Sequence, residues 1–324
     1  MKRHTENTVL VTGANGFVGQ ALCGEMLRQG WQVSAAVRAP CQLPVAVATV
    51  SVGAIDGETN WADALREVDV VIHLAARVHV MEDMAADPLA EFLKVNAQGT
   101  ANLARQAAAA GVKRLVYVSS IKVNGEQTSE TQPFAASDPP DPQDAYAVSK
   151  WQAEQALHGI AQETGLEVVI MRPPLVYGPG VKGNFIRLLA AVDQGVPLPL
   201  AGVRNKRSLI YLGNLVDALI LCASHPDASG KTYLVRDGED VSMPELVRQI
   251  AAELGKSARL FPLPAGLLRG MGGLFGKLES VERITSSLRV NDDLIRRELG
   301  WKPAFTLQQG LQATAGWYKA HAIP

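Results

Sequence analysis

The feature that most constrains the fold is a strand, a glycine-rich turn and a helix near the start of the chain. The strand is expected over Thr8–Thr12, the turn reads Gly13-Ala14-Asn15-Gly16-Phe17-Val18-Gly19, and a helix is expected over Ala21–Gln29. The first glycine permits a tight turn, the second lets the backbone approach a pyrophosphate, and the third allows close helix packing. Free N–H groups at a helix N-terminus suit phosphate oxygens. An ordinary structural turn is the alternative, but the flanking elements favour a dinucleotide site.

Strands and helices alternate along the chain after this segment. Further strands are expected over Gln32–Val37, Val45–Val52, Val68–Leu74, Lys113–Val118 and Glu167–Met171. This alternation predicts an α/β, Rossmann-type doubly wound parallel sheet that is covered by helices on both faces. We expect a dinucleotide-binding domain over residues 1–175, which also receives about 205–230. A smaller, discontinuous C-terminal α/β substrate-binding domain is expected within 176–324.

Composition narrows the class of protein. The chain has 324 residues, 47% of them hydrophobic, and a formal net charge of -1, so we expect a large core and no nucleic acid partner. Its three cysteines, Cys23, Cys41 and Cys222, stand far apart and have no histidine in ligand spacing, so we predict buried thiols and no metal site.

The same sequence indicates no membrane span. The first residues are polar and lead directly into a strand, so no signal peptide is expected. No apolar run approaches the ~20 residues that a spanning helix needs. Leu263–Leu278, which is rich in Gly and Leu, is interpreted as packed core or a mobile lid, with contact to a membrane surface as the alternative. We therefore expect a cytoplasmic protein.

Tyr146 and Lys150 stand four residues apart in a segment with helical character, so they share one helix face. A tyrosine has a pKa of about 10, and a nearby ammonium favours its phenolate. Such a pair can move a proton to or from a substrate hydroxyl. This spacing also arises often by chance, so an ordinary surface pair remains the alternative if the two residues are considered alone.

The end of the second expected strand bears on the choice of cofactor. A dinucleotide fold commonly has an acidic residue there, about 20 residues after the glycine turn, which binds the adenosine ribose. Here the strand ends Ala36-Val37-Arg38-Ala39. A guanidinium suits a 2′-phosphate, so we favour NADP(H) over NAD(H). The alternative is a solvated Arg38 with NAD(H) bound.

Taken together, the motifs resemble an extended short-chain dehydrogenase/reductase of the nucleotide-sugar epimerase/dehydratase group. The matching segments span nearly the whole chain in order: Thr12 to Gly19, His73-Leu74-Ala75-Ala76, Asn96 with Gly99-Thr100, Val118-Ser119-Ser120, Tyr146 with Lys150, Arg172 to Gly180, Arg207 to Tyr211, and Leu299-Gly300-Trp301. The segment Ser120-Ile121-Lys122-Val123-Asn124-Gly125-Glu126 resembles more closely the branch of this family that is found in bacterial O-antigen and capsule gene clusters.

The resemblance implies roles for individual residues. Tyr146 would be the acid/base on the sugar 4-oxygen, Lys150 would hold the nicotinamide ribose and lower the pKa of Tyr146, and Ser120 would hydrogen-bond the same oxygen. The implied cofactor-binding residues are Gly13, Asn15, Gly16, Phe17, Val18, Gly19, Arg38, Ile55, Asp56, Leu74, Ala75, Ala76, Asn96, Val118, Tyr146, Lys150 and Pro173. The implied substrate-binding residues are Ser120, Lys122, Tyr146, Asn184 and Arg207. His73 is interpreted as a packed core histidine.

The chain also departs from the family pattern. Leu175 stands where relatives often have Asn, and Ala201 stands where an aromatic residue commonly stacks on the base. The Arg-Pro-Gly-Asp segment seen near the end of many relatives is absent. Arg283 and Arg289 are candidates to replace its arginine, and the sequence places neither. These departures affect the expected substrate contacts more than the expected chemistry.

Two reactions fit this resemblance. We favour a 4-keto-sugar reductase acting on a nucleotide-linked, UDP-type hexose in surface-polysaccharide biosynthesis, because Arg38 replaces the acid of NAD-retaining epimerases. A 4-epimerase with bound NAD is the alternative. Ser120-Ile121-Lys122 lacks the acid/base pair of a 4,6-dehydratase, and a non-catalytic NAD(P)-binding regulator fits less well because Tyr146 and Lys150 are both present. A homodimer is expected through Asp87–Ala110 and Tyr146–Thr164.

Overall fold

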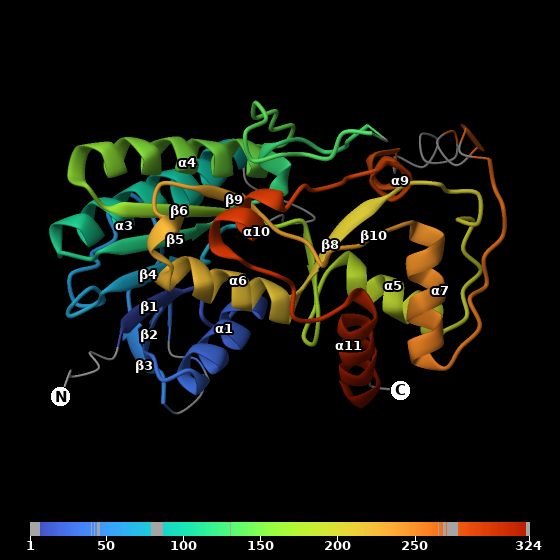
Figure 1. Cartoon of the computed structure of the whole chain (residues 1–324), viewed down its shortest axis with the longest axis horizontal. Coiled ribbons are helices and arrows are strands. Elements are labelled where there is room, and N and C mark those ends of the chain that lie inside the picture. The colour runs from blue at the N-terminus through green and yellow to red at the C-terminus, as the bar shows by residue number, and fades with distance from the viewer. Residues whose placement is uncertain are drawn as a thin grey trace.

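The computed structural model describes residues 7–321 except 40, 42, 44–45, 79–86, 130, 265, 268–269 and 271–277. A seven-stranded sheet in the order β3-β2-β1-β4-β5-β6-β9 organises the larger part of the molecule (Figure 1). All of its neighbouring strands pair in parallel. The strands are β1 (Thr8–Thr12), β2 (Gln32–Val37), β3 (Ala48–Ser51), β4 (Val70–His73), β5 (Arg114–Val118), β6 (Glu167–Arg172) and β9 (Thr232–Leu234). This confirms the expected doubly wound sheet, although β3 is shorter than predicted and β9 was not anticipated.

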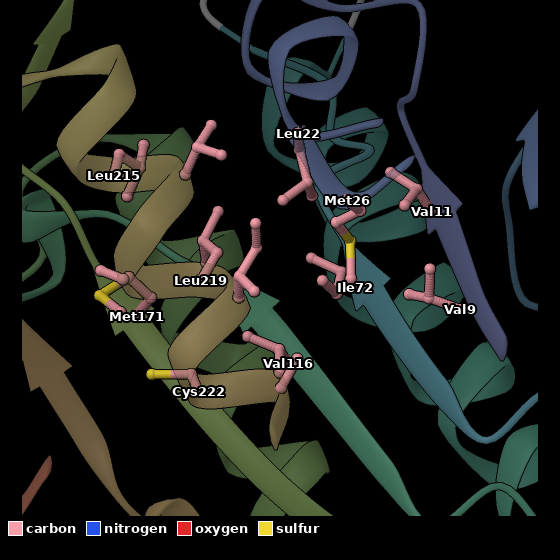
Figure 2. Packing of buried hydrophobic residues seen from close by; sticks show 14 of the residues in the cluster. Val9, Val11, Leu22, Met26, Ile72, Val116, Met171, Leu215, Leu219 and Cys222 are labelled. Carbon is pink, nitrogen blue, oxygen red and sulfur yellow. The ribbon is translucent and has the colours of Figure 1, made fainter. Parts of the chain in front are cut away.

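Alternate side chains of each strand point to opposite faces, and both faces are buried. Val9 and Val11 of β1 lie in the same buried cluster as residues of α1 (Phe17–Arg28) and α6 (Leu212–Ser224), part of which Figure 2 shows. Leu10 between them belongs to the opposite layer, with α3 (Gly99–Ala109) and α4 (Ala145–Thr164). Burial on both faces explains why the strands are continuous apolar runs.

The long helix expected over Asp87–Ala110 is divided into three parts. It consists of α2 (Pro88–Phe92), a π-helical segment over Leu93–Gln98, and α3. Asp87 caps the first part by accepting a hydrogen bond from the Ala90 amide. The π-helical segment changes the helix phase at Asn96, and such segments occur frequently at functional sites.

The rest of the chain forms a second cluster beside the carboxyl ends of the strands (Figure 1). A three-stranded sheet of β10 (Asp240–Val241), β8 (Arg207–Tyr211) and β7 (Leu175–Tyr177) joins it to the larger sheet. The helices packed in this cluster are α5 (Asn184–Asp193), α7 (Met243–Leu254) and α11 (Leu307–His321).

The closing segment of the chain contains two helices. Its first helix, α10 (Asp293–Leu299), ends at Gly300, whose positive φ of 66° stops the helix, and α11 follows. The short α9 (Leu278–Thr285) precedes both. Most of Leu263–Leu278 lies outside the described residues. Among the residues that are described, no helix is long and apolar enough to cross a membrane.

Candidate active site

The sequence-predicted site residues converge because parallel strands end at one edge of the sheet. The glycine turn follows β1, Arg38 follows β2, and Leu74 to Ala76 follow β4. Ser119 and Ser120 follow β5, and Pro173 follows β6. The strand order reverses between β1 and β4, and ligands of open α/β sheets bind at such a reversal.

The glycine turn has the tight geometry that a pyrophosphate site requires. Gly13 has a φ of 68°, and a Cβ there would lie 2.8 Å from the Ala75 amide nitrogen. A Cβ on Gly19 would collide with the Gly13 carbonyl oxygen. Gly16 begins α1 without a side-chain cap, so the first N–H groups of the helix face the turn without competition from a capping side chain. The residues present therefore fit a bound dinucleotide phosphate.

The residues expected to contact the adenosine differ in whether their side chains are exposed or already bonded within the protein. Arg38 is exposed, and the described part of the chain offers it no hydrogen bond or ion pair. The Asp56 carboxylate accepts hydrogen bonds from the Glu58 amide and the Thr59 hydroxyl. Ile55 packs so closely on α3 that a Cβ on Gly99 would lie 2.7 Å from its Cγ2.

Helix α4 positions the two residues that are predicted to be catalytic, Tyr146 and Lys150. Asp144 caps the helix by accepting a hydrogen bond of 2.7 Å from the Ala147 amide, so Tyr146 and Lys150 lie in the first two turns. The Lys150 ammonium donates to the Val118 carbonyl at 2.9 Å and lies 5.9 Å from the centre of the Tyr146 ring. Ser120 lies close enough to Tyr146 to lower the pKa of its phenol. The three residues predicted to be catalytic are therefore neighbours.

Burial dominates the electrostatics of this pair. It raises the pKa of Tyr146 to about 12, with a further increase from the Asp144 carboxylate that Ser120 partly offsets. Burial lowers the pKa of Lys150 to about 7, and Glu154 opposes that shift. The expected lowering of the Tyr146 pKa by Lys150 is therefore absent in the protein alone, because desolvation disfavours the charged form of both groups.

Asn96 holds the backbone next to the predicted cofactor site. Its amide nitrogen donates to the Arg77 carbonyl and the Ser149 hydroxyl, at 3.0 and 2.9 Å, and its carbonyl accepts from the Arg77 amide. Both amide hydrogens are therefore engaged within the protein. The contact of Asn96 with a cofactor stays a prediction, and its side chain holds the backbone at Arg77 beside the predicted site.

The residues predicted to bind the substrate differ in their exposure and in the partners that they contact. The Lys122 ammonium lies 2.6 Å from both the Glu126 and the Asp144 carboxylates, so it is already neutralised beside Tyr146. Arg207 donates to the backbone carbonyls of Arg283 and Ser286. Asn184 is exposed at the start of α5.

The two arginines that the sequence could not place are separated by the structure. Arg283 lies beside Arg207, with its Nε 3.9 Å from the Glu126 carboxylate. Arg289 instead donates to Asp240 at 2.8 Å. Arg283 is therefore the one that can join Arg207 in contacting an anionic group near Lys122.

A buried charged network beneath the site was missed by the sequence analysis. Glu154, two turns after Tyr146, is fully buried and pairs with Arg172 through a two-pronged contact that includes an Nε–Oε1 distance of 3.0 Å. Ser119 donates to the same carboxylate, and Arg172 also donates to Asn124. An acidic residue on the buried face of an apolar helix requires a cation, and this was the signal available in the sequence.

A separate hollow of about 1100 Å³ opens between α1, α6 and α11. The residues that line it include Gly16, Phe17, Gly180, Phe305 and Trp317. None of Ser120, Tyr146 and Lys150 lies in its wall. The hollow therefore borders the glycine turn and does not include the three residues predicted to be catalytic.

Comparisons with known proteins agree with this geometry. The family model described as "NAD dependent epimerase/dehydratase family" matches residues 9–235. The UDP-glucose 4-epimerase of Vibrio cholerae is 43% identical over 97% of this chain and 96% of its own length. The N-acetyl-α-D-glucosaminyl-diphospho-ditrans,octacis-undecaprenol 4-epimerase of Escherichia coli O157:H7 is 27% identical over 98% and 96%. The structure of MoeE5 in complex with UDP-glucuronic acid and NAD has a TM-score of 0.78, with 28% identity over 98% of this chain and 100% of that one.

Proposed function

The chain belongs to the NAD-dependent epimerase/dehydratase family, and from this premise we propose that it transfers hydride at C4 of a UDP-linked hexose. The observation that carries the proposal is the grouping of Ser120, Tyr146 and Lys150 at the sheet edge that also holds the glycine turn. The structural relative MoeE5 binds UDP-glucuronic acid and NAD, which supports the substrate class.

Within this proposal the chain's own residues handle the proton and the substrate. Tyr146 gives a proton to the sugar 4-oxygen or takes one from it, and Ser120 orients that oxygen. When bound, the nicotinamide would exchange hydride with C4, and its oxidised form would bring a positive charge that favours the Tyr146 phenolate. Lys150 binds the nicotinamide ribose. Arg207 and Arg283 contact the diphosphate of the substrate.

Epimerisation is the form that the relatives favour. Two whole-length relatives carry the name of a 4-epimerase, and one of them shares 43% of its residues with this chain. In this form the glycine turn and Lys150 would hold NAD through the catalytic cycle, and the cofactor would supply a reversible hydride exchange at C4 of the sugar.

Arg38 favours a second candidate, the 4-keto-sugar reductase. This exposed guanidinium occupies the strand end at which an acid normally binds the adenosine ribose. It suits the 2′-phosphate of NADP(H), which a reductase would bind and release at each turnover. The two candidates therefore differ first in their cofactor.

The cofactor content of the purified protein tests both candidates. We would denature the protein and identify the released nucleotide by absorbance and mass. Stoichiometric NAD⁺, followed by interconversion of UDP-glucose and UDP-galactose or of their N-acetyl forms, supports the epimerase. An empty protein that binds NADPH more tightly than NADH and reduces UDP-4-keto-6-deoxy sugars supports the reductase. If no UDP-sugar is turned over with either cofactor, the proposed function is wrong.

Three further proposals accompany this function. The part built on the seven-stranded sheet, residues 1–175 with about 205–230, binds the cofactor, and the remainder binds the sugar nucleotide. The protein is a cytoplasmic enzyme of surface-polysaccharide synthesis. Two copies pair through α4 and the helical segment Asp87–Ala110, which sedimentation equilibrium would test.

A further inference from the structure

The Lys150 ammonium has few partners for a charge so deeply buried. The residue is 2% exposed, and the ammonium makes a single hydrogen bond, to the Val118 carbonyl, among the described residues. No carboxylate of the described residues forms an ion pair with it. Glu154, one turn further along α4, is already paired with Arg172. Glu154 favours the charged form of Lys150 although it is paired with Arg172, and a further contact is needed to stabilise an ammonium so deeply buried.

The face of the Tyr117 ring lies against this ammonium. Lys150 Nζ is 4.7 Å from the ring centroid, within the range in which a cation is attracted by an aromatic face. Tyr117 is 0% exposed and sits opposite His73 in the pairing of β4 and β5. Its ring stacks on that of His73 with the two centroids 5.7 Å apart, so the neighbouring strand β4 helps to fix its orientation.

We infer that Tyr117 is a positioning residue for the proposed reaction: its ring face binds the Lys150 ammonium, keeps it protonated and holds it beside Tyr146. The contact between the ring and the ammonium follows from the geometry alone. Its effect on turnover rests on the proposed function. The ring does this work and the hydroxyl does not. In the described part of the chain, the buried hydroxyl lacks a hydrogen bond of normal geometry.

Among the groups around Lys150, the Tyr117 ring is the one whose effect on the ammonium can be varied by substitution. Tyr146 and Glu154 face it from α4, and Arg172 of β6 neutralises Glu154. Burial lowers the pKa of His73 on β4 to about 3, so this ring stays neutral. Burial also raises the pKa of Tyr117 well above its usual value, so the ring carries no charge of its own.

The pKa of Lys150 lies near neutrality, where a small change in stabilisation alters the protonated fraction strongly. Burial lowers it to about 7. A desolvated cation–π contact of this type corresponds to roughly one pKa unit. If the ring face is lost, the ammonium should therefore lose its proton at a lower pH.

The test is a direct titration of Lys150 in variants of the whole protein. Protein labelled with ¹³Cε-lysine would be followed by NMR, and the Lys150 signal would be assigned by its loss in Lys150→Arg. Tyr117→Phe keeps the ring face and should leave the pKa of Lys150 unchanged. Tyr117→Leu removes the face and should lower that pKa by about one unit.

A fluorinated series keeps the test decisive if Tyr117→Leu fails to fold. Mono-, di- and trifluorophenylalanine at position 117 preserve the ring shape while they progressively weaken its negative face. The pKa of Lys150 should fall stepwise along this series. A pKa that stays at the Tyr117→Phe value throughout would overturn the inference, as would a shift in Tyr117→Phe equal to that in Tyr117→Leu.

Activity provides the second measurement. If the wild type turns over a UDP-sugar, the alkaline limb of kcat should move to lower pH in step with the pKa of Lys150. The NMR titration needs no substrate. Failure of the proposed function is therefore seen in the assay of the wild type, and failure of this inference is seen in the titration.

Discussion

The ammonium nitrogen of Lys150 lies 5.9 Å from the centre of the Tyr146 ring, and Lys150 is buried while Tyr146 is partly exposed. Their pKa values are shifted in opposite directions, to about 7 for the ammonium and about 12 for the phenol. At neutral pH the protein alone therefore holds a protonated tyrosine next to a lysine that is close to its own titration point. Small changes in charge within the site will alter both protonation states.

Tyr146→Phe should abolish most of the turnover while leaving cofactor binding in place. A positioned acid/base contributes about 10²- to 10⁴-fold to a rate, and phenylalanine keeps the ring that packs edge-on against Phe92. We would measure kcat and the affinity for NAD or NADPH. Tyr318→Phe, on α11, is the matched control and should retain full activity. Undiminished turnover in Tyr146→Phe would exclude Tyr146 as the acid/base.

Arg38→Ala should weaken NADPH binding by about tenfold or more and leave NADH binding nearly unchanged. The exposed guanidinium would otherwise contact the 2′-phosphate, and charge-assisted hydrogen bonds of this type contribute about 1.5–3 kcal/mol. Binding would be followed by fluorescence of the reduced cofactors. Arg66→Ala removes a cation that is 74% exposed and pairs with Asp63 on its own segment, and it should change neither affinity. Equal losses for both cofactors would show that Arg38 does not distinguish them.

Two glycines of α1 should respond oppositely to alanine. Gly19→Ala brings a Cβ into the Gly13 carbonyl oxygen and should lower the free energy of unfolding by about 1–3 kcal/mol, as overpacking does. Gly24→Ala meets no atom within 4 Å and should raise it by about 1 kcal/mol through helix propensity. Urea unfolding would measure both. The cofactor affinity should fall only in Gly19→Ala, and equal stability of the two variants would contradict the tight turn.

Glu154→Gln should lower the free energy of unfolding by about 3–5 kcal/mol. The substitution keeps the shape of the side chain but leaves the buried Arg172 guanidinium without its counter-charge. Glu163→Gln, at an exposed position on the same helix, should stay within about 0.5 kcal/mol of the wild type. Similar effects of the two substitutions in chemical denaturation would show that the buried pair does not stabilise the fold.

Stability should fall as the pH is lowered from 7 to 5, in part because of His73. Burial lowers the pKa of His73 to about 3 from an ordinary value of 6.5. Below pH 6.5 the unfolded chain therefore binds a proton that the folded protein excludes. This linkage removes about 2 kcal/mol from the free energy of unfolding by pH 5.

His73→Gln should flatten this pH dependence by the same amount, because the amide does not titrate. It can still reach Thr12 and Thr100, which hydrogen-bond the imidazole at 2.6 and 2.9 Å. His158→Gln, at an exposed position on α4, should leave the slope unchanged. Unfolding curves in urea at several pH values would give the slopes, and identical slopes for wild type and His73→Gln would exclude His73 as the source.

Much of the fold could be predicted from the sequence because its signals are local. The glycine turn, the apolar strands and the four-residue spacing of Tyr146 and Lys150 depend on neighbours along the chain. The predicted helix around Tyr146 is confirmed as α4, which begins after Asp144, and the order of strands agrees with the Rossmann-type sheet. Backbone geometry and hydrophobic periodicity determine such features before any long-range contact forms.

Tertiary structure alone decided the environment of the site. It paired Glu154 with Arg172 of β6, set Lys122 between Glu126 and Asp144, and placed Tyr117 of β5 under the Lys150 ammonium. It also turned Arg207 toward the backbone carbonyls of residues 283 and 286. Apart from the Lys122–Glu126 pair, which spans only four residues, each of these contacts joins segments that are distant in sequence. Desolvation and charge pairing depend on all the atoms around a group, so the pKa values of Tyr146 and Lys150 could not be read from their spacing.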